Sequence, residues 1–427
     1  MKMYQQSVLR NGLRIITSHL AGRDSIGFAI WVRVGGRFEQ KNLCGISHFV
    51  EHMLFKGTKR RTTRQIKEDV EGIGGMLNAF TSEESTCYFV KIPKAHLKIA
   101  FDVLQDMVNN ATLSVEEFKK ERTVILEEIK MYLDLPSQYV HEITSELLWP
   151  TQPLGRPIAG TIESVSHLTR NDLYRHVQTH YHPRNLLVTA CGEIDHDEIK
   201  ELSEQYFNGR NRKPVSKFKQ AQLSSRLKRD KFRFLDKKTE QTHFVIGFHG
   251  LSRNHPDRYQ LALLNVILGA NMSSRLFEEV RERRGLAYEI KSGLSFFNDT
   301  GSIEISAGVE PKKAPLAIRV IMRELGRLKR KIVSKDELRR AKDYFLGQFL
   351  LGLEDTLDHA LWYGERVLYG GELPDIREIH REIEQVTEKD IQNLSQRSFK
   401  TSGIHLALIG PVDSKFETKT RSECLCP

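Results

Sequence analysis

The chain alternates between short apolar runs with a period of two residues and longer segments with a helical period. Six runs rich in β-branched and aromatic residues predict strands at 26–34, 86–92, 186–191, 243–248, 302–309 and 405–409. Asn11-Gly12 separates two further apolar runs, 7–9 and 13–16, and predicts a hairpin near the amino end. Amphipathic segments between the strands predict helices that cover a sheet on one face, so the pattern indicates an α+β fold.

A long internal repeat divides this pattern into two halves. Residues 88–104 and 306–322 both read as strand, proline and amphipathic helix, and residues 113–122 and 333–342 both begin a helix with a serine N-cap. The offset is about 220 residues. We therefore expect two homologous α/β units, residues 1–213 and residues 233–427, joined by a basic linker at 214–232.

Composition and charge narrow the class of protein. Of the 427 residues, 39% are hydrophobic and 28% are charged, which is typical of globular domains. The formal net charge of +10 is concentrated between Asn208 and Arg233, where Asp230 is the single acid. No aromatic stacking pattern or nucleic-acid module accompanies these basic residues, so we interpret the segment as a solvated linker and expect no nucleic-acid partner.

The remaining composition predicts a cytoplasmic protein. The longest apolar stretches, such as 261–270, are interrupted and shorter than the ~18 to 20 residues that span a bilayer, so no membrane segment is expected. The amino end lacks the apolar core and cleavage site of a secretion signal. Five cysteines form an odd set with no regular spacing, as in a reducing compartment, and Cys424 and Cys426 receive no role.

The most informative motif is His48-Phe-Val-Glu51-His52, which we expect on a helix capped by Ser47. Two histidines four residues apart share one face of a helix, so both imidazoles can reach one zinc ion. Glu51 lies beside them and can point toward the same ion without binding it.

A catalytic zinc needs a third protein ligand, which must come from another segment. The segment 121–130 predicts a helix whose buried side is formed by Val124, Ile125 and Ile129. Glu121 and Glu128 are two turns apart on one face, whereas Glu127 points about 100° away. Periodicity therefore favours Glu128 with Glu121 over Glu127.

The chain resembles the pitrilysin or insulinase family of inverted zincins, in particular its mitochondrial processing peptidase-like branch. The resemblance covers essentially the whole chain. Its blocks are the motif running to Gly57-Thr58, Gly74-Gly75 with Asn78-Ala79-Phe80-Thr81, the helix from Glu121 to Glu128, and Ser273-Ser-Arg-Leu-Phe277 through Arg281-Glu282 to Gly285-Leu-Ala-Tyr288.

This resemblance implies a role for each matching residue. His48, His52 and Glu128 would bind zinc, Glu51 would be the general base, and Glu121 would orient a ligating imidazole. An edge strand containing Asn78, Ala79 and Phe80 would pair with the substrate backbone. Arg281 and Tyr288, from the second half, would hold the substrate and polarise its carbonyl.

The repeat itself predicts one zinc ion per chain. Gln348 occupies the position that matches Glu128, and the second half has no His-x-x-Glu-His string. His176, His180 and His182 contain another pair at i and i+4, and a second metal site there is the weaker alternative because no carboxylate helix accompanies it.

The resemblance implies a zinc metalloendopeptidase that hydrolyses extended oligopeptides or presequence-like segments inside a closed chamber formed by a homodimer, with largely antiparallel sheets covered by helices. The alternative is a non-catalytic assembly subunit of the same fold, which would have lost its ligands. Glu71, Glu83 and Glu84 could favour basic substrates.

Overall fold

The computed structural model describes residues 4–208, 213–223, 230–369, 371 and 373–425. Two compact units, each with one sheet, make up the fold. The first consists of Met1–Lys130, Arg156–Lys219 and Leu350–Asp375, and the second of Met131–Gly155, Gln220–Phe349 and Ile376–Pro427. Parts of the predicted basic linker and neighbouring residues, 209–212 and 224–229, lie outside the described residues, as does Cys426.

The first sheet has the strand order β1-β2-β6-β3-β5-β4, and the second has the order β7-β11-β8-β10-β9. The strands are β1 (Gln5–Val8), β2 (Arg14–His19), β3 (Ser25–Val32), β4 (Met76–Thr81), β5 (Thr86–Pro93), β6 (Leu186–Gly192), β7 (Phe232–Asp236), β8 (Thr242–Gly250), β9 (Ala287–Phe296), β10 (Gly301–Val309) and β11 (His405–Gly410).

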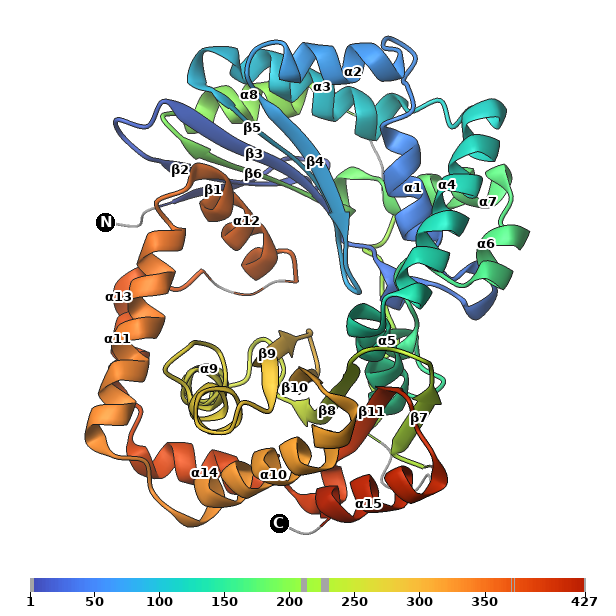
Figure 1. Ribbon diagram of the computed structural model, residues 1–427. Helices are drawn as coiled ribbons and strands as arrows, with labels where there is room; N and C mark the ends of the chain where they lie inside the picture. Colours follow the sequence, from blue (N-terminus) through green and yellow to red (C-terminus); the bar gives the residue numbers. More distant parts are fainter. Residues whose placement is uncertain (1–3, 209–212, 224–229, 370, 372, 426–427) are drawn as a thin grey trace. The chain divides into compact units, whose positions relative to one another are not determined.

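The helices surround these sheets (Figure 1). They are α1 (Ile46–Leu54), α2 (Thr63–Glu71), α3 (Leu97–Asn110), α4 (Val115–Asp134), α5 (Pro136–Leu148), α6 (Ile162–His167), α7 (Arg170–His180), α8 (His196–Tyr206), α9 (Arg258–Leu268), α10 (Ala314–Arg330), α11 (Lys335–Gly352), α12 (Thr356–Val367), α13 (Ile376–Gln385), α14 (Glu388–Ser398) and α15 (Ser414–Leu425). Short helical turns are η1 (Gly36–Phe38), η2 (Lys41–Leu43), η3 (Lys94–His96), η4 (Pro153–Gly155), η5 (Pro183–Asn185), η6 (Phe277–Glu282), η7 (Pro311–Lys313) and η8 (Thr401–Gly403).

The two sheets share one topology, as the sequence repeat predicts. Apart from the additional strand β1, the order β2-β6-β3-β5-β4 matches β7-β11-β8-β10-β9 element for element. Each sheet contains one parallel pair of strands, β2 with β6 in the first sheet and β7 with β11 in the second. The other pairs are antiparallel. The α+β fold with two largely antiparallel sheets is confirmed.

The six predicted strands and the amino-terminal hairpin are also confirmed, with ends shifted by at most three residues. The apolar pattern did not predict β4, β7 or β9, and β4 was expected only from the family resemblance. In β9 the side chains of Glu289 and Lys291 on one face are exposed, and the strand therefore lacks a continuous apolar run.

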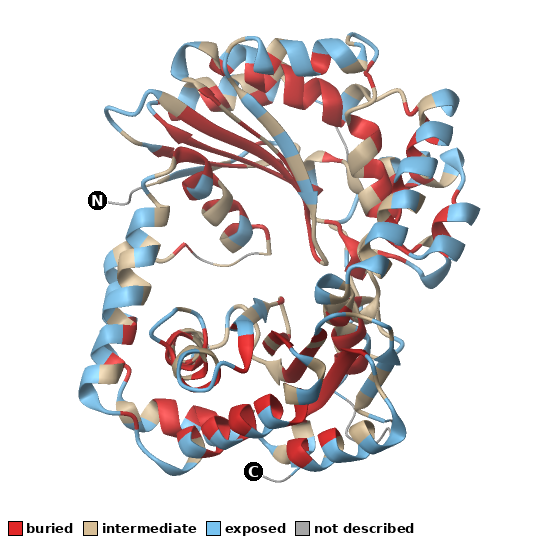
Figure 2. Ribbon diagram, in the orientation of Figure 1, coloured by how far each residue is buried: buried red, intermediate tan, exposed pale blue. Residues whose placement is uncertain are grey.

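Helices cover both faces of the first sheet, so the prediction of one covered face is wrong. Phe101 of α3 packs on Phe28 of β3, with ring centroids 4.9 Å apart. Because side chains alternate along a strand, Ala29 and Trp31 point to the other face, where they pack with Ala360 and Tyr363 of α12. Buried residues accordingly line both sides of this sheet (Figure 2).

The helices that complete the sheets are exchanged between the halves of the chain. The helix α5 follows α4 in the first half and packs on β8 and β11 of the second unit through Val140, Ile143 and Leu147. Its counterpart α12 follows α11 in the second half and packs on β3 and β6 of the first unit. The predicted boundaries treat each half as continuous, whereas each compact unit contains one helical segment from the other half.

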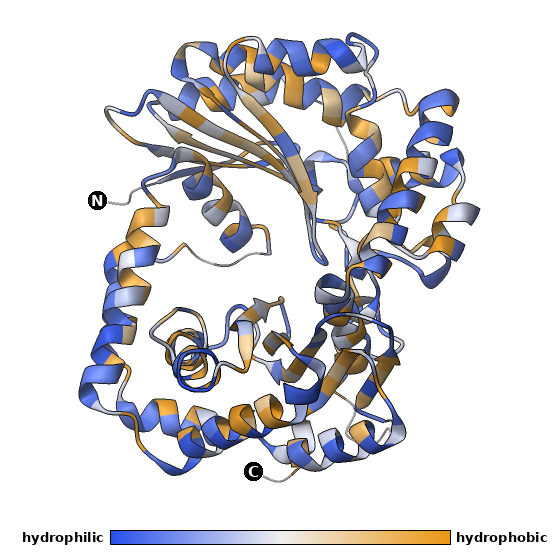
Figure 3. Ribbon diagram, viewed as in Figure 1, coloured by the Kyte–Doolittle hydropathy of each residue, from blue (hydrophilic) through white to orange (hydrophobic). Residues whose placement is uncertain are grey.

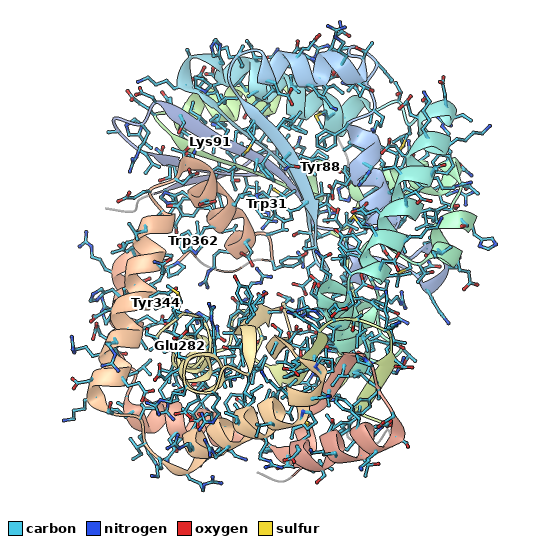
Figure 4. The ribbon with its side chains drawn as sticks, viewed as in Figure 1. Trp31, Tyr88, Lys91, Glu282, Tyr344 and Trp362 are labelled. Carbon is cyan, nitrogen blue, oxygen red and sulfur yellow. The ribbon has the colours of Figure 1, made fainter. Side chains whose placement is uncertain are left out.

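Polar contacts fix α12 at its first turn. Asp355 accepts hydrogen bonds from the N–H groups of Leu357 and Asp358 at 2.8 and 3.2 Å, and Lys91 of β5 forms an ion pair with the same carboxylate. Figure 4 labels Lys91 and Trp31 on the sheet and Trp362 on α12, the elements that these contacts join. The strands and the inner sides of their helices hold most of the apolar residues (Figure 3).

Two glycines allow the exchanged helices to approach the sheets. Gly27 of β3 lies against the start of α12, and Gly247 of β8 lies against α5. A Cβ at Gly27 would lie 2.4 Å from the Cα of Leu357, and a Cβ at Gly247 would lie 2.8 Å from the Cγ2 of Thr144. The first neighbour is backbone and the second is a methyl group that can move.

We expect Gly27→Ala to lower the free energy of unfolding by ~3 kcal/mol, at the upper end of the range for overpacking, and Gly247→Ala to lower it less. Thermal unfolding of the purified variants measures this. Gly293→Ala on β9 is the matched control, because no atom lies within 4 Å of the added Cβ. Equal midpoints for the Gly27 and Gly293 variants would contradict the close approach of α12.

Candidate metal centre and active site

The helix α1 starts two residues earlier than the sequence suggested, and its first N–H groups bind a carboxylate from outside the helix. Ser47 lies inside the helix, so its prediction as N-cap is wrong. Glu39 instead accepts hydrogen bonds from the N–H groups of Gly45 and Ser47, both at 2.8 Å. A negative charge at this end also suits the helix dipole. Burial raises the pKa of Glu39 to about 7, although these hydrogen bonds favour the charged form.

A ring stack aligns α1 with α4. Phe49 of α1 and Phe118 of α4 lie with their centroids 5.0 Å apart and their planes 6° apart, and both are buried. The buried side of α4 continues through Glu121, Ile125 and Ile129. Val124 is 50% exposed, so its prediction as a buried residue is wrong.

This alignment brings His48, His52 and Glu128 together. The Oε2 atom of Glu128 lies 3.8 Å from Nε2 of His48 and 3.7 Å from Nε2 of His52. One nitrogen or oxygen atom from each residue lies within 4.8 Å of the others, a spacing that could hold one divalent ion. Within the described ranges no other group of three or more His, Cys, Asp or Glu residues has such a spacing.

The chemical state of these atoms fits a metal ion. Glu128 Oε2 is buried and has no hydrogen-bond partner among the described residues, which is costly for a carboxylate that has no cation. Burial and the nearby His52 lower the pKa of His48 to about 4, so this imidazole is neutral at pH 7 and has a lone pair available.

Glu121 fixes the orientation of His52. Its Oε2 lies 3.1 Å from Nδ1 of His52, and its Oε1 accepts a hydrogen bond from Lys56 at 2.7 Å. Because a carboxylate only accepts hydrogen bonds, Nδ1 of His52 carries the proton and Nε2 is free to face Glu128. Although burial alone would raise it, the hydrogen bonds from His52 and Lys56 lower the pKa of Glu121.

Glu51 lies beside the three residues and is held by the edge strand β4. Thr81 donates a hydrogen bond to Oε2 of Glu51 at 2.5 Å. Burial raises the pKa of Glu51 above its ordinary value, against the opposing effects of the Thr81 hydrogen bond and of His52. A carboxylate with a raised pKa is suited to accept and return a proton.

Several alternatives from the sequence are resolved by the same geometry. Glu127 is exposed and pairs with Lys130 at 2.7 Å. His176 is buried with Nε2 3.5 Å from Ser47 Oγ, and His180 Nδ1 lies 2.7 Å from Ser216 Oγ. Both ring nitrogens of His182 are buried without a hydrogen-bond partner, but among the described residues these three histidines do not bring their ligand atoms within 4.8 Å of one another.

Asn78, Ala79 and Phe80 lie on β4, which is the edge strand of the first sheet. Phe80 contacts Trp31 with ring centroids 5.6 Å apart. The N–H group of Ala79 donates to the Asn78 side-chain oxygen at 2.8 Å.

The second unit brings Arg281 and Tyr288 side by side. Arg281 lies on η6, a π-helical turn, and Tyr288 is near the start of β9 with 79% of its surface exposed. The Arg281 guanidinium lies 5.2 Å from the Tyr288 ring centroid and 4.7 Å from that of Phe277. Such π-helical turns occur frequently at functional sites.

Glu84 is not available for basic substrates. Its carboxylate is buried and forms an ion pair with the buried Arg37 at 2.6 Å. Glu71 is exposed.

Sequence reasoning missed Glu39, Lys56 and Thr81. Lys56 lies four residues after His52, and Thr81 directly follows Asn78-Ala79-Phe80, so their positions gave a weak signal. Glu39 gave none, because a cap that comes from outside the helix has no fixed spacing from it.

The chain belongs to the insulinase family, peptidase family M16. Residues 14–162 match that family, and residues 167–345 match the family's domain described as the peptidase M16 inactive domain. An uncharacterized zinc protease of Streptomyces coelicolor is 35% identical over 96% of this chain and 90% of its own length. One of Bacillus subtilis is 34% identical over 96% of this chain and 98% of its own length.

Solved structures show the same fold. A protease from Helicobacter pylori has a TM-score of 0.88 at 22% identity, covering 96% of this chain and 99% of that chain. A chain of complex III from Candida albicans has a TM-score of 0.81 at 19% identity, covering 98% of this chain and 99% of that chain.

In the part of this chain that the structure describes, no helix has the length and apolar character needed to cross a membrane.

We expect the stability of the protein to depend on pH through Glu39. Because its folded pKa is about 7 and the ordinary value is 4.5, the folded state binds more protons than the unfolded chain between these values. The contribution of Glu39 to the free energy of unfolding therefore falls as the pH rises from 4.5 to 7. The total loss is about 3 kcal/mol, at ~1.36 kcal/mol for each pKa unit of the shift. Urea unfolding of Glu39→Gln and wild type between pH 4.5 and 7.5 should show the variant gaining relative stability with pH.

The exposed Glu127→Gln variant is the control and should follow the wild-type pH dependence. A constant difference between wild type and Glu39→Gln across this range would contradict the buried cap.

Proposed function

We propose that this protein is a zinc-dependent endopeptidase that hydrolyses peptide bonds in extended oligopeptides or presequence-like segments. One observation carries the proposal. The Nε2 atoms of His48 and His52 face a buried Glu128 oxygen that has no other described hydrogen-bond partner, and Glu51 lies beside them. The names of the relatives, zinc proteases, support the same metal and reaction.

His48, His52 and Glu128 would hold one zinc ion per chain. Zinc at this position would polarise the scissile carbonyl and lower the pKa of a coordinated water. Glu51 accepts a proton from the attacking water and delivers it to the leaving amine nitrogen. Glu121, held by Lys56, keeps His52 in the tautomer that leaves Nε2 unprotonated.

The strand β4 would bind the substrate backbone. Ser82 N–H donates to Ser85 O at 2.8 Å, which makes this a hydrogen-bonded pair. Hydrogen-bonded and open pairs alternate along an antiparallel ladder, so Ala79 and Thr81 direct their backbone groups to the free edge. An extended peptide can pair with these groups once the Asn78 side chain releases the Ala79 N–H.

Arg281 and Tyr288 would complete the substrate site. The Tyr288 hydroxyl would donate to the oxyanion of the carbonyl under attack, an interaction worth ~3 to 4 kcal/mol. Arg281, whose guanidinium lies near the Tyr288 ring, would bind the peptide backbone.

The alternative is a non-catalytic assembly subunit of the same fold. The similarity to a complex III chain, whose fold alone is shared, motivates it. Such a subunit would not need the four residues His48, Glu51, His52 and Glu128, all of which this chain has.

We expect purified protein to bind one zinc ion and to cleave a quenched-fluorescence peptide in a chelator-sensitive reaction. Glu51→Gln should keep its zinc and lose activity by ~10²-fold or more. His48→Ala and Glu128→Gln should lose both, because each removes a ligand. Metal analysis and initial rates measure these outcomes.

Glu127→Gln is the matched control for Glu128→Gln, one residue away and exposed. It should retain wild-type zinc content and activity. Wild type that neither binds zinc nor hydrolyses peptides would favour the assembly subunit, and equal zinc content in all variants would contradict the metal site.

We also propose that the protein works as a cytoplasmic homodimer. Light scattering at working concentration should give twice the chain mass of 49.3 kDa. A stable monomer that retains full activity would contradict the dimer.

A further inference from the structure

Thr81 is the last residue of β4, and its side chain leaves the sheet on the α1 side. Phe80, the preceding residue, contacts Trp31 on the opposite face. Alternation along the strand therefore turns the Thr81 hydroxyl toward α1, where it donates to Glu51 Oε2 at 2.5 Å.

This contact limits the freedom of the Glu51 carboxylate. A glutamate side chain has several rotatable bonds, and fixing it costs conformational entropy. The hydrogen bond to Oε2 restricts these rotations and leaves Oε1 as the oxygen that can accept a proton. A general base acts efficiently only when it lies within hydrogen-bond reach of the proton it removes.

The hydroxyl donor is itself held by a buried scaffold outside the proposed metal site. Directly after Thr81, the turn from Ser82 to Ser85 is bound to η1 by two backbone hydrogen bonds, Gly36 N to Ser82 O at 3.2 Å and Arg37 N to Glu83 O at 2.7 Å. The Arg37–Glu84 ion pair, 2.6 Å long and buried, closes the same turn. Phe218 covers the Arg37 guanidinium at 3.9 Å.

We propose that Thr81 is a positioning residue for Glu51, through which the strand that binds the substrate also sets the orientation of the general base. The inference rests on the proposed function of Glu51 and of β4. Ala79 and Thr81 share the free edge of one strand, so the register of a bound peptide and the direction of the Glu51 carboxylate are fixed by the same backbone.

Thr81→Val tests this, because it removes the hydroxyl and keeps a β-branched side chain of similar size. We expect kcat to fall by ~10 to 100-fold, the effect of losing a hydrogen bond to a charged group, while KM for the peptide stays within about twofold. Zinc content should match wild type, and the variant should still unfold in one cooperative thermal transition. Thr81→Ser, which keeps the hydroxyl, should restore kcat to within about threefold of wild type.

The outcomes separate this inference from the proposed function. Wild-type kcat in Thr81→Val, or equal losses in the Val and Ser variants, would overturn the positioning role while the peptidase activity stands. A wild-type protein without chelator-sensitive hydrolysis would overturn both. A fall in kcat confined to Thr81→Val, with zinc retained, supports the assignment.

Discussion

The contact between α1 and α4 is the constraint on which the rest of the site depends. His48, Glu51 and His52 share one helix, so their relative positions follow from helical geometry alone. Glu128 belongs to another helix, and its position depends on how the two helices pack. The Phe49–Phe118 stack and the Glu121 hydrogen bonds to His52 and Lys56 fix that packing on both sides of the three converging residues.

Local spacing explains what could be predicted from the sequence. The strands with apolar runs follow from a period of two residues, and the shared face of His48 and His52 follows from their spacing of four. The convergence of these histidines with Glu128 on another helix was implied only by the resemblance to the family. The choice of Glu128 over Glu127 also follows from helical period, and the structure agrees because Glu127 points to solvent. By contrast, Glu39 acts on α1 from a separate segment, and no periodicity reports such a contact.

Tertiary contacts decided the remaining features. Val124 is apolar but exposed, so the hydrophobic pattern wrongly predicted that it is buried. The strand β9 has charged residues on one face, so the same pattern did not predict it as a strand. The covering of both sheet faces was missed for a related reason. The helix α5, which follows α4 in the sequence, packs on β8 and β11, which come about 100 and about 260 residues later. Nothing local distinguishes it from a helix that packs on its own half.

The exchange of α5 and α12 has a consequence for the folding of the newly made chain. The first compact unit includes Leu350–Asp375, so it can be completed only after about seven eighths of the polypeptide has left the ribosome. A cut between the halves would give two fragments, each lacking one helical segment of its own unit and carrying one that belongs to the other. Each half of the duplicated chain therefore depends on the other for one of the helices that cover its sheet.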